Sequence, residues 1–195
     1  MNRGYSRFDS FASILVGTVT VAAIVVFAPA PVFAKTPQEI AQLAISATVV
    51  INSQYPNGAI GSGSGFIIAK QGTTYTVLTA NHVVDDTKPT YTIRSHTGKD
   101  YPVTSFKRLQ KSQNEADVAV VTFNCAESYP VVTLGDSEQA IVGATIFVVG
   151  YPAIPTSRNY QKERHFEFVP GFVTSRISSH PQGYNLRYNA ITTGG

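Results

Sequence analysis

The chain has 195 residues, of which 43% are hydrophobic and 14% charged, so it can bury a core and does not have the composition of a disordered protein. Fifteen Lys and Arg against twelve Asp and Glu give a net charge of +3 without a basic cluster, which argues against nucleic acid as a partner. A single cysteine, Cys125, excludes an internal disulfide framework and a cysteine-rich zinc site. Ten Tyr and eleven Phe, with no Trp, favour strands over helical bundles.

Residues 1–34 have the pattern of a secretory signal peptide. Arg3 and Arg7 form a basic start, an apolar run covers 11–27, and Val32-Phe33-Ala34 supplies small or modest side chains before a cleavage point. The alternative is an uncleaved anchor, because the apolar run lies at the lower edge of the length that spans a bilayer. We expect cleavage after Ala34 and export to the periplasm, the cell envelope or the medium. The mature chain is then expected to have no stable membrane association.

Residues 35–195 are predicted to form an all-β domain that follows a short helix. Thr36-Pro37-Gln38-Glu39 is a helix start with a capping box. After it, β-branched and aromatic runs alternate with turn-forming residues at the spacing of a barrel or sandwich. A soft boundary near 125–129 separates two units, about 46–125 and 126–195. The expected strands are 47–53, 64–70, 73–80, 90–95, 100–107, 117–123, 131–134, 144–149, 163–177 (two strands or one bent strand) and 184–190.

One of the four histidines has the setting of a general base. His82 stands at the end of a predicted strand, flanked by small and apolar residues, so a rigid element would hold it while its ring faces a cleft. The alternative is an ordinary core or loop histidine. The other three are His96, His165 and His180, and no pair of the four has the short spacing of metal ligands, so we expect no metal.

Asp117 is the candidate partner of this histidine. It directly precedes an entirely apolar run, 118–121. A buried carboxylate is costly unless it is hydrogen-bonded or paired, and an aspartate here could orient an imidazole and stabilise its charged form. A strand-capping or turn aspartate is the alternative interpretation.

The segment 61–65, Gly-Ser-Gly-Ser-Gly, lacks the following helix and the lysine of a phosphate loop, so nucleotide binding is disfavoured and no cofactor is expected. We predict a tight bend into a strand at a point where backbones approach closely. Nothing in the spacing marks Ser62 or Ser64 as a nucleophile, and both are rejected in that role.

Three motifs carry a family resemblance through their order: Gly63-Ser64-Gly65-Phe66-Ile67-Ile68, then 78–84 (LTANHVV), then 116–120 (ADVAV), with the later segments 134–136, 143–152 and 188–195 in agreement. Together they resemble the trypsin-like, chymotrypsin-fold serine endopeptidases, and most closely the bacterial branch with the glutamyl endopeptidases and HtrA-type proteases. The resemblance implies two β-barrels with an active site between them and polypeptide substrates. It makes His82 the general base and acid of a Ser-His-Asp triad, with Asp117 as its orienting partner.

The resemblance also assigns residues near the end of the sequence. Gly195 matches a glycine whose N–H helps to form the oxyanion hole, and Thr192 matches a pocket threonine of the glutamyl endopeptidases. The nucleophile would follow two residues after Gly195. We therefore expect a second barrel truncated at its C-terminus and a 195-residue chain that is inactive as it stands. A fragment or partial gene is the simpler explanation. The alternative is a non-catalytic secreted β-domain, a pseudoprotease that binds peptides or proteins. No HtrA-type peptide-binding domain is recognised, and a monomer is expected.

Overall fold

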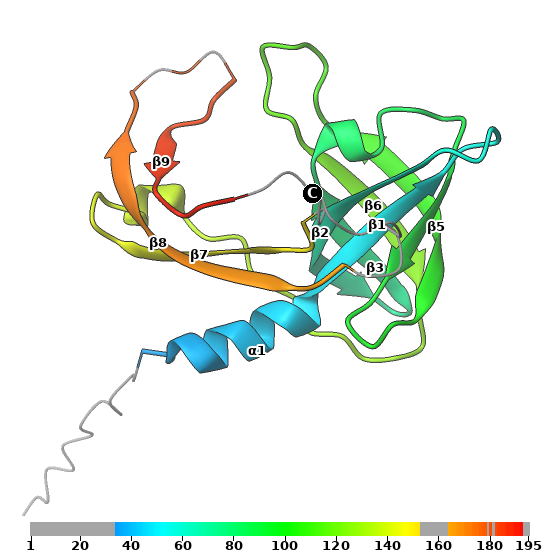
Figure 1. Cartoon of the computed structure of the whole chain (residues 1–195), viewed down its shortest axis with the longest axis horizontal. Helices are drawn as coiled ribbons and strands as arrows, with labels where there is room; N and C mark the ends of the chain where they lie inside the picture. The colour runs from blue at the N-terminus through cyan, green and yellow to red at the C-terminus, as the bar shows by residue number, and fades with distance from the viewer. Residues whose placement is uncertain (1–33, 153–163, 179, 181, 193–195) are drawn as a thin grey trace, which may run out of the picture. The chain divides into compact units, whose positions relative to one another are not determined.

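The computed structural model describes residues 34–152, 164–178, 180 and 182–192 (Figure 1). The chain divides into two units, 1–34 and 35–195, and the description concerns the second. Its described residues form nine strands, one α-helix and two single turns of 3-10 helix. The predicted all-β class is confirmed.

The helix α1 (Pro37–Ala47) begins where its capping box predicts. The Glu39 backbone N–H donates to the Thr36 hydroxyl at 3.3 Å, and the Thr36 backbone N–H donates to the Glu39 carboxylate at 2.7 Å. Pro37 occupies the first turn, where a missing N–H costs nothing. At Thr48 the backbone becomes extended and the first strand begins. None of the helices among the described residues is long and apolar enough to cross a membrane.

Six antiparallel strands close into a barrel, drawn from cyan to green in Figure 1, in the order β1-β2-β3-β6-β5-β4. The strand β4 pairs with β1 and completes the circle, so the barrel has no free edge that could pair with another chain. The six strands are β1 (Thr48–Gln54), β2 (Ile60–Gln71), β3 (Thr74–Thr79), β4 (Thr90–Arg94), β5 (Asp100–Arg108) and β6 (Ala119–Asn124).

The interior of the barrel is filled by alternate residues of these strands. Every second side chain points inward, so the buried residues are Tyr75, Val77 and Thr79 in β3 and Ala119, Val121 and Phe123 in β6. The Tyr75 and Phe123 rings stack with centroids 5.3 Å apart. Each fully buried apolar side chain contributes about 1.5–3 kcal/mol. This core fixes the paired ends of β3 and β6.

The glycine-serine run, 61–65, lies inside β2 as extended strand, so the predicted tight bend is wrong. The predicted close approach of backbones is present. A Cβ added at Gly65 would lie 2.6 Å from Val77 Cγ1 and 2.9 Å from the Leu78 carbonyl oxygen. Glycine is therefore needed here because β2 and β3 come too close for a side chain, and not because the chain turns.

The remaining strands form a second, three-stranded antiparallel sheet. They are β7 (Thr145–Gly150), β8 (Glu167–Arg176) and β9 (Leu186–Tyr188), in the order β7-β8-β9. Of the segment predicted at 163–177, the described residues 164–177 contain a single strand, β8. The strand predicted at 131–134 is wrong: these residues are irregular, and Val132 donates its N–H to the Ile67 carbonyl without joining a ladder.

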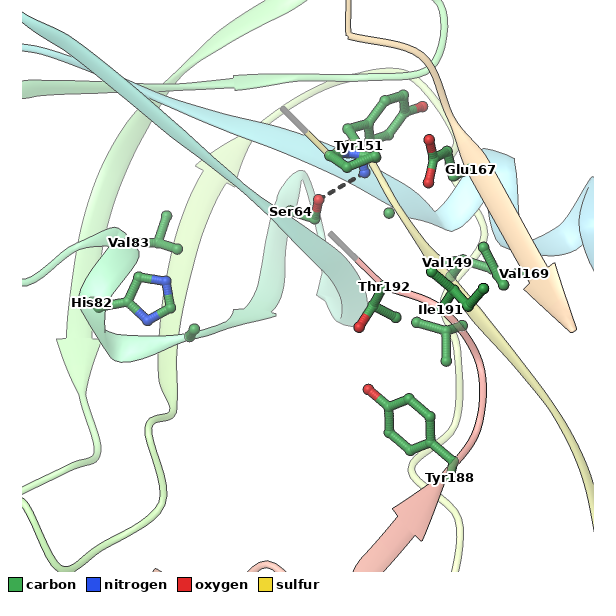
Figure 2. Close-up of a pocket in the computed structure, with 14 residues that line it drawn as sticks. Ser64, His82, Val83, Val149, Tyr151, Glu167, Val169, Tyr188, Ile191 and Thr192 are labelled. Carbon is green, nitrogen blue, oxygen red and sulfur yellow. Dashed lines mark hydrogen bonds between the residues drawn. The ribbon is translucent and has the colours of Figure 1, made fainter. Parts of the chain in front are cut away.

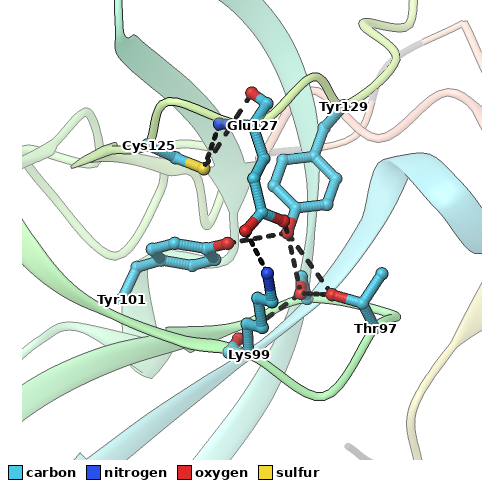
Figure 3. Close-up of polar contacts among 7 residues, drawn as sticks. Thr97, Lys99, Tyr101, Cys125, Glu127 and Tyr129 are labelled. Atoms are coloured by element: carbon cyan, nitrogen blue, oxygen red, sulfur yellow. Dashed lines mark hydrogen bonds and ion pairs between the residues drawn. The ribbon is translucent and has the colours of Figure 1, made fainter.

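A half-buried polar cluster joins the β4–β5 turn to the segment that follows β6 (Figure 3). The Tyr129 hydroxyl lies 2.8 Å from the Tyr101 hydroxyl, donates to Ser95 Oγ at 3.1 Å and lies 3.1 Å from Glu127 Oε2. Lys99 pairs with the same Glu127 carboxylate. Burial raises the pKa of Tyr101, so its phenol stays protonated and can donate. These bonds satisfy polar groups that would otherwise be costly to bury.

Cys125 lies at the edge of this cluster and is only 6% exposed. Its Sγ accepts a hydrogen bond from the Glu127 backbone N–H at 3.1 Å. A structural thiol buried in this way is chemically inert. An odd cysteine is a liability in an oxidising compartment unless it is shielded, and here it is shielded.

Candidate active site

His82 stands on a short turn directly after the third barrel strand. The turn, η1 (Asn81–Val83), is a single turn of 3-10 helix, and the fully buried Val84 anchors it to the core. The His82 side chain is 65% exposed, so its ring projects away from the barrel interior.

Asp117 lies in the loop that leads into β6, two residues before Ala119. Because β3 and β6 are antiparallel neighbours, with Thr79 paired to Ala119, the end of one strand adjoins the start of the other. A residue just after β3 and a residue just before β6 therefore meet at the same rim of the barrel. This register brings His82 and Asp117 close together in space although they lie far apart in the sequence.

The two residues make a two-point contact. His82 Nδ1 lies 2.5 Å from Asp117 Oδ2, and the His82 backbone N–H donates to Asp117 Oδ1 at 3.0 Å. Since a carboxylate accepts, Nδ1 carries the proton, which leaves Nε2 as the free basic nitrogen. Burial opposes ionisation of Asp117, but the hydrogen bonds from the His82 side chain and backbone prevail and hold the pKa of Asp117 below its ordinary value. Asp117 is therefore an anion at neutral pH.

His82 borders a pocket of about 460 Å³ that barrel and second-sheet residues line together (Figure 2). The sheet contributes the paired residues Val148 and Val169, and Glu167 lies beside Gly150 in the same register. The pocket is thus mainly apolar on the sheet side, with one carboxylate. Its lining comprises Ser64, Ala80, His82, Val83, Val148, Val149, Gly150, Tyr151, Pro152, Glu167, Val169, Tyr188, Ile191 and Thr192.

Ser64 is a further pocket residue, and its contact gives it a structural role. Its Oγ accepts a hydrogen bond from the Tyr151 backbone N–H at 2.8 Å, which ties β2 to the end of β7. No hydrogen bond between Ser64 and His82 is present in the described part of the chain. Ser62 pairs with Asn52 in the β1–β2 ladder. Their rejection as nucleophiles stays a prediction.

The other residues singled out from the sequence have separate locations. Thr192 lines the pocket, whereas Gly195 lies outside the described residues. His96, His165 and His180 are exposed and are not among the pocket residues. Within the described ranges, no group of three His, Cys, Asp or Glu side chains is arranged to hold a metal ion.

Three residues of the site escape sequence reasoning. Glu167 and Tyr188 line the pocket, and the Tyr184 hydroxyl accepts a hydrogen bond from the Asp117 backbone N–H at 2.9 Å. The turn before Tyr184 can be read from its Pro-Gln-Gly composition, but its partner lies 67 residues away. No local pattern contains that pairing.

The closed six-stranded barrel and the second sheet agree with a trypsin-like, all-β fold. A family model of the trypsin-like peptidase domain matches residues 63–195, more than half of the chain. The chain belongs to this family. Its fold is the trypsin-like all-β fold, and its function is of the serine-protease type, a hydrolase function with polypeptide substrates. A search of curated proteins found no match.

Proposed function

We propose that this chain carries the base and the orienting acid of a serine endopeptidase, with His82 and Asp117 as two members of a Ser-His-Asp triad. The observation that carries the proposal is the 2.5 Å contact between His82 Nδ1 and Asp117 Oδ2 at the border of the pocket. In this geometry Asp117 fixes the tautomer of the imidazole. His82 Nε2 is then free to take a proton from a serine hydroxyl and to return it to the leaving amine, while Asp117 stabilises the imidazolium between the two steps.

The serine of the proposed triad belongs two residues after Gly195, and Gly195 itself belongs to the oxyanion hole. Both assignments rest on the resemblance to bacterial trypsin-like endopeptidases. Hydrolysis by this triad requires that serine, because His82 and Asp117 supply a base and its orienting partner but no nucleophile. Without the nucleophile, only binding and the oxyanion hole contribute to any residual effect on a peptide bond.

The test begins with the gene, read beyond the Gly195 codon. If the frame continues into a serine turn, the chain that includes it should hydrolyse a protein substrate, and a serine-directed phosphonate should block this. His82→Ala should lower kcat on the order of 10⁶-fold, because the serine loses its base. His165→Ala, which changes an exposed histidine that does not line the pocket, is the matched control and should keep full activity. Full activity of His82→Ala would contradict the proposal.

A stop codon directly after Gly195 would favour the second candidate, a secreted β-domain that binds peptides without cleaving them. The observation in its favour is the pocket itself, which residues of the described chain already line. A peptide library should then yield ligands of the 195-residue chain, and Val169→Asp, which places a charge on the apolar wall, should weaken them. A chain that neither cleaves nor binds peptides would exclude both candidates.

The likeness to glutamyl endopeptidases makes Thr192 a proposed substrate contact. Glu167 lines the same pocket, and two carboxylates in one pocket repel each other. An acidic substrate side chain would therefore meet an unfavourable charge. Glu167→Gln is expected to raise cleavage after Glu relative to cleavage after Leu in otherwise identical peptides.

We further propose that residues 1–34 direct export and are removed, which leaves a monomer without stable membrane association. The support is the order of basic, apolar and small residues in that segment. Mass spectrometry of the exported protein should give a new N-terminus at Lys35. Recovery of the intact chain in the membrane fraction would favour the anchor instead.

A further inference from the structure

The loop between β8 and β9 contacts the loop that carries Asp117. The Asp117 backbone N–H donates to the Tyr184 hydroxyl at 2.9 Å. Asp117 precedes β6, whose ladder with β3 begins at Ala119, so this N–H lies outside the barrel's hydrogen-bond pattern. The phenol therefore supplies the partner that the strand does not.

A second hydrogen bond joins the same two loops. The Gln182 side-chain amide donates to the Gln113 carbonyl at 3.0 Å. The turn that presents these side chains depends on Gly183, whose φ of +76° is readily adopted by glycine. The Gly183 N–H donates to the His180 carbonyl at 2.9 Å and closes the turn. Gln182 and Tyr184 thus contact the loop that carries Asp117 at two points, Gln113 and Asp117 itself.

Asp117 is consequently held from two sides. Its carboxylate contacts the His82 ring and backbone, and its own backbone contacts Tyr184. A carboxylate orients an imidazole only while the distance and angle between them are kept, and displacements of about 1 Å are costly in catalysis. The loop that carries Asp117 has no strand of its own to supply that precision.

We propose that Tyr184 is a positioning residue: through the Asp117 backbone it fixes the carboxylate relative to His82 and makes the histidine–aspartate pair depend on the second sheet. The consequence for turnover rests on the proposed function, whereas the consequence for the geometry of Asp117 does not.

The first test uses the 195-residue chain and needs no hydrolysis. The Asp117 carboxyl is followed by carbon NMR as a function of pH in wild type and in Tyr184→Phe, which removes only the hydroxyl. Tyr184→Phe should move the pKa of Asp117 upward, toward its ordinary value, because the bonds from His82 that lower it are less well kept. Tyr55→Phe is the matched control: it removes a hydroxyl between β1 and β2, from a residue that does not line the pocket, and should leave this titration unchanged.

A titration of Tyr184→Phe that coincides with wild type would overturn the proposal. If Tyr184→Phe fails to fold, Gln182→Ala removes the other contact of the same loop and should give a shift in the same direction. No shift in a folded Gln182→Ala would then overturn it.

The second test uses a chain that hydrolyses peptides. Loss of one hydrogen bond to a neutral donor should lower kcat roughly 2–10-fold in Tyr184→Phe, with KM unchanged. If His82→Ala abolishes hydrolysis while Tyr184→Phe keeps full kcat, this inference fails and the proposed function stands. If the Asp117 titration moves but a chain with the serine turn does not hydrolyse peptides, the proposed function fails and the positioning role stands.

Discussion

At the scale of single residues, the pairing of His82 with Asp117 ties the stability of the fold to pH. The pKa of Asp117 is lower in the folded chain than its ordinary value. A carboxyl group with a lowered folded pKa stabilises the fold above its unfolded pKa of about 3.9, and this contribution is lost as the pH falls through the lower, folded value. The ionised Asp117 carboxylate should therefore strengthen the fold at neutral pH, and this contribution should be lost in acid.

Asp117→Asn tests this expectation. Urea unfolding should show a lower free energy of unfolding for the variant than for wild type at pH 7, because the charged contact with His82 is gone. The difference should shrink as the pH is lowered from about 4 through the folded pKa of Asp117. Asp85→Asn, at an exposed aspartate in the loop after η1, is the control and should change stability little at either pH. A difference for Asp117→Asn that grows in acid would contradict the sign of the shift.

His82 and Asp117 are accessible to sequence reasoning because each lies at the junction of a recognisable strand with a loop. Their meeting is not accessible, because it depends on which strands pair, and the register of β3 with β6 decides it. Tyr184 and Glu167 are less accessible still. Their roles arise from contacts between segments that nothing in the local pattern connects.

At the scale of the elements, β2 depends on the absence of a side chain at Gly65. In Gly65→Ala the new Cβ would clash with the Leu78 carbonyl, which belongs to the paired strand and cannot rotate away. The variant should lose about 1–3 kcal/mol of unfolding free energy, the usual cost of overpacking. Gly135→Ala is the matched control, since nothing lies within 4 Å of its added Cβ. Equal denaturation midpoints for the two variants would show that β2 and β3 can separate at little cost.

The elements also show where sequence patterns fail. Residues 131–134 have a composition typical of a strand, but a strand also needs a neighbouring strand. These residues have a single backbone hydrogen bond to Ile67 instead of a ladder. The prediction for 61–65 is wrong in the opposite sense, because a bend is expected and a strand is found. The glycines suggest a turn, although the strand forms because β1 supplies a ladder along the whole run and β3 joins it at Gly65. In both cases the missing information is the partner.

At the scale of the whole molecule, the barrel and the second sheet differ in how much core they have. Among the described residues, the buried hydrophobic side chains lie in or beside the barrel, with the exceptions of Tyr151 and Val173. The contacts that join the sheet to the barrel include polar bonds such as those of Ser64 with Tyr151 and of Tyr184 with Asp117. Regions with few buried apolar contacts open at lower free energy than the core that supports them.

Native-state hydrogen exchange should therefore distinguish the barrel from the second sheet by the free energy at which their amides exchange. Backbone amides of β3 and β6, such as those of Val77 and Val121, should exchange only through global unfolding. Amides of β7 and β8 should exchange through a local opening of lower free energy and weaker denaturant dependence, because less surface is exposed. Equal exchange free energies in both parts would contradict this and would mean that the few joining bonds make the fold one cooperative unit. With the expected result, the sheet side of the pocket can open while the barrel rim keeps His82 and Asp117 paired. The hydrogen bond between Tyr184 and Asp117 would then couple opening of the sheet to the geometry of that pair.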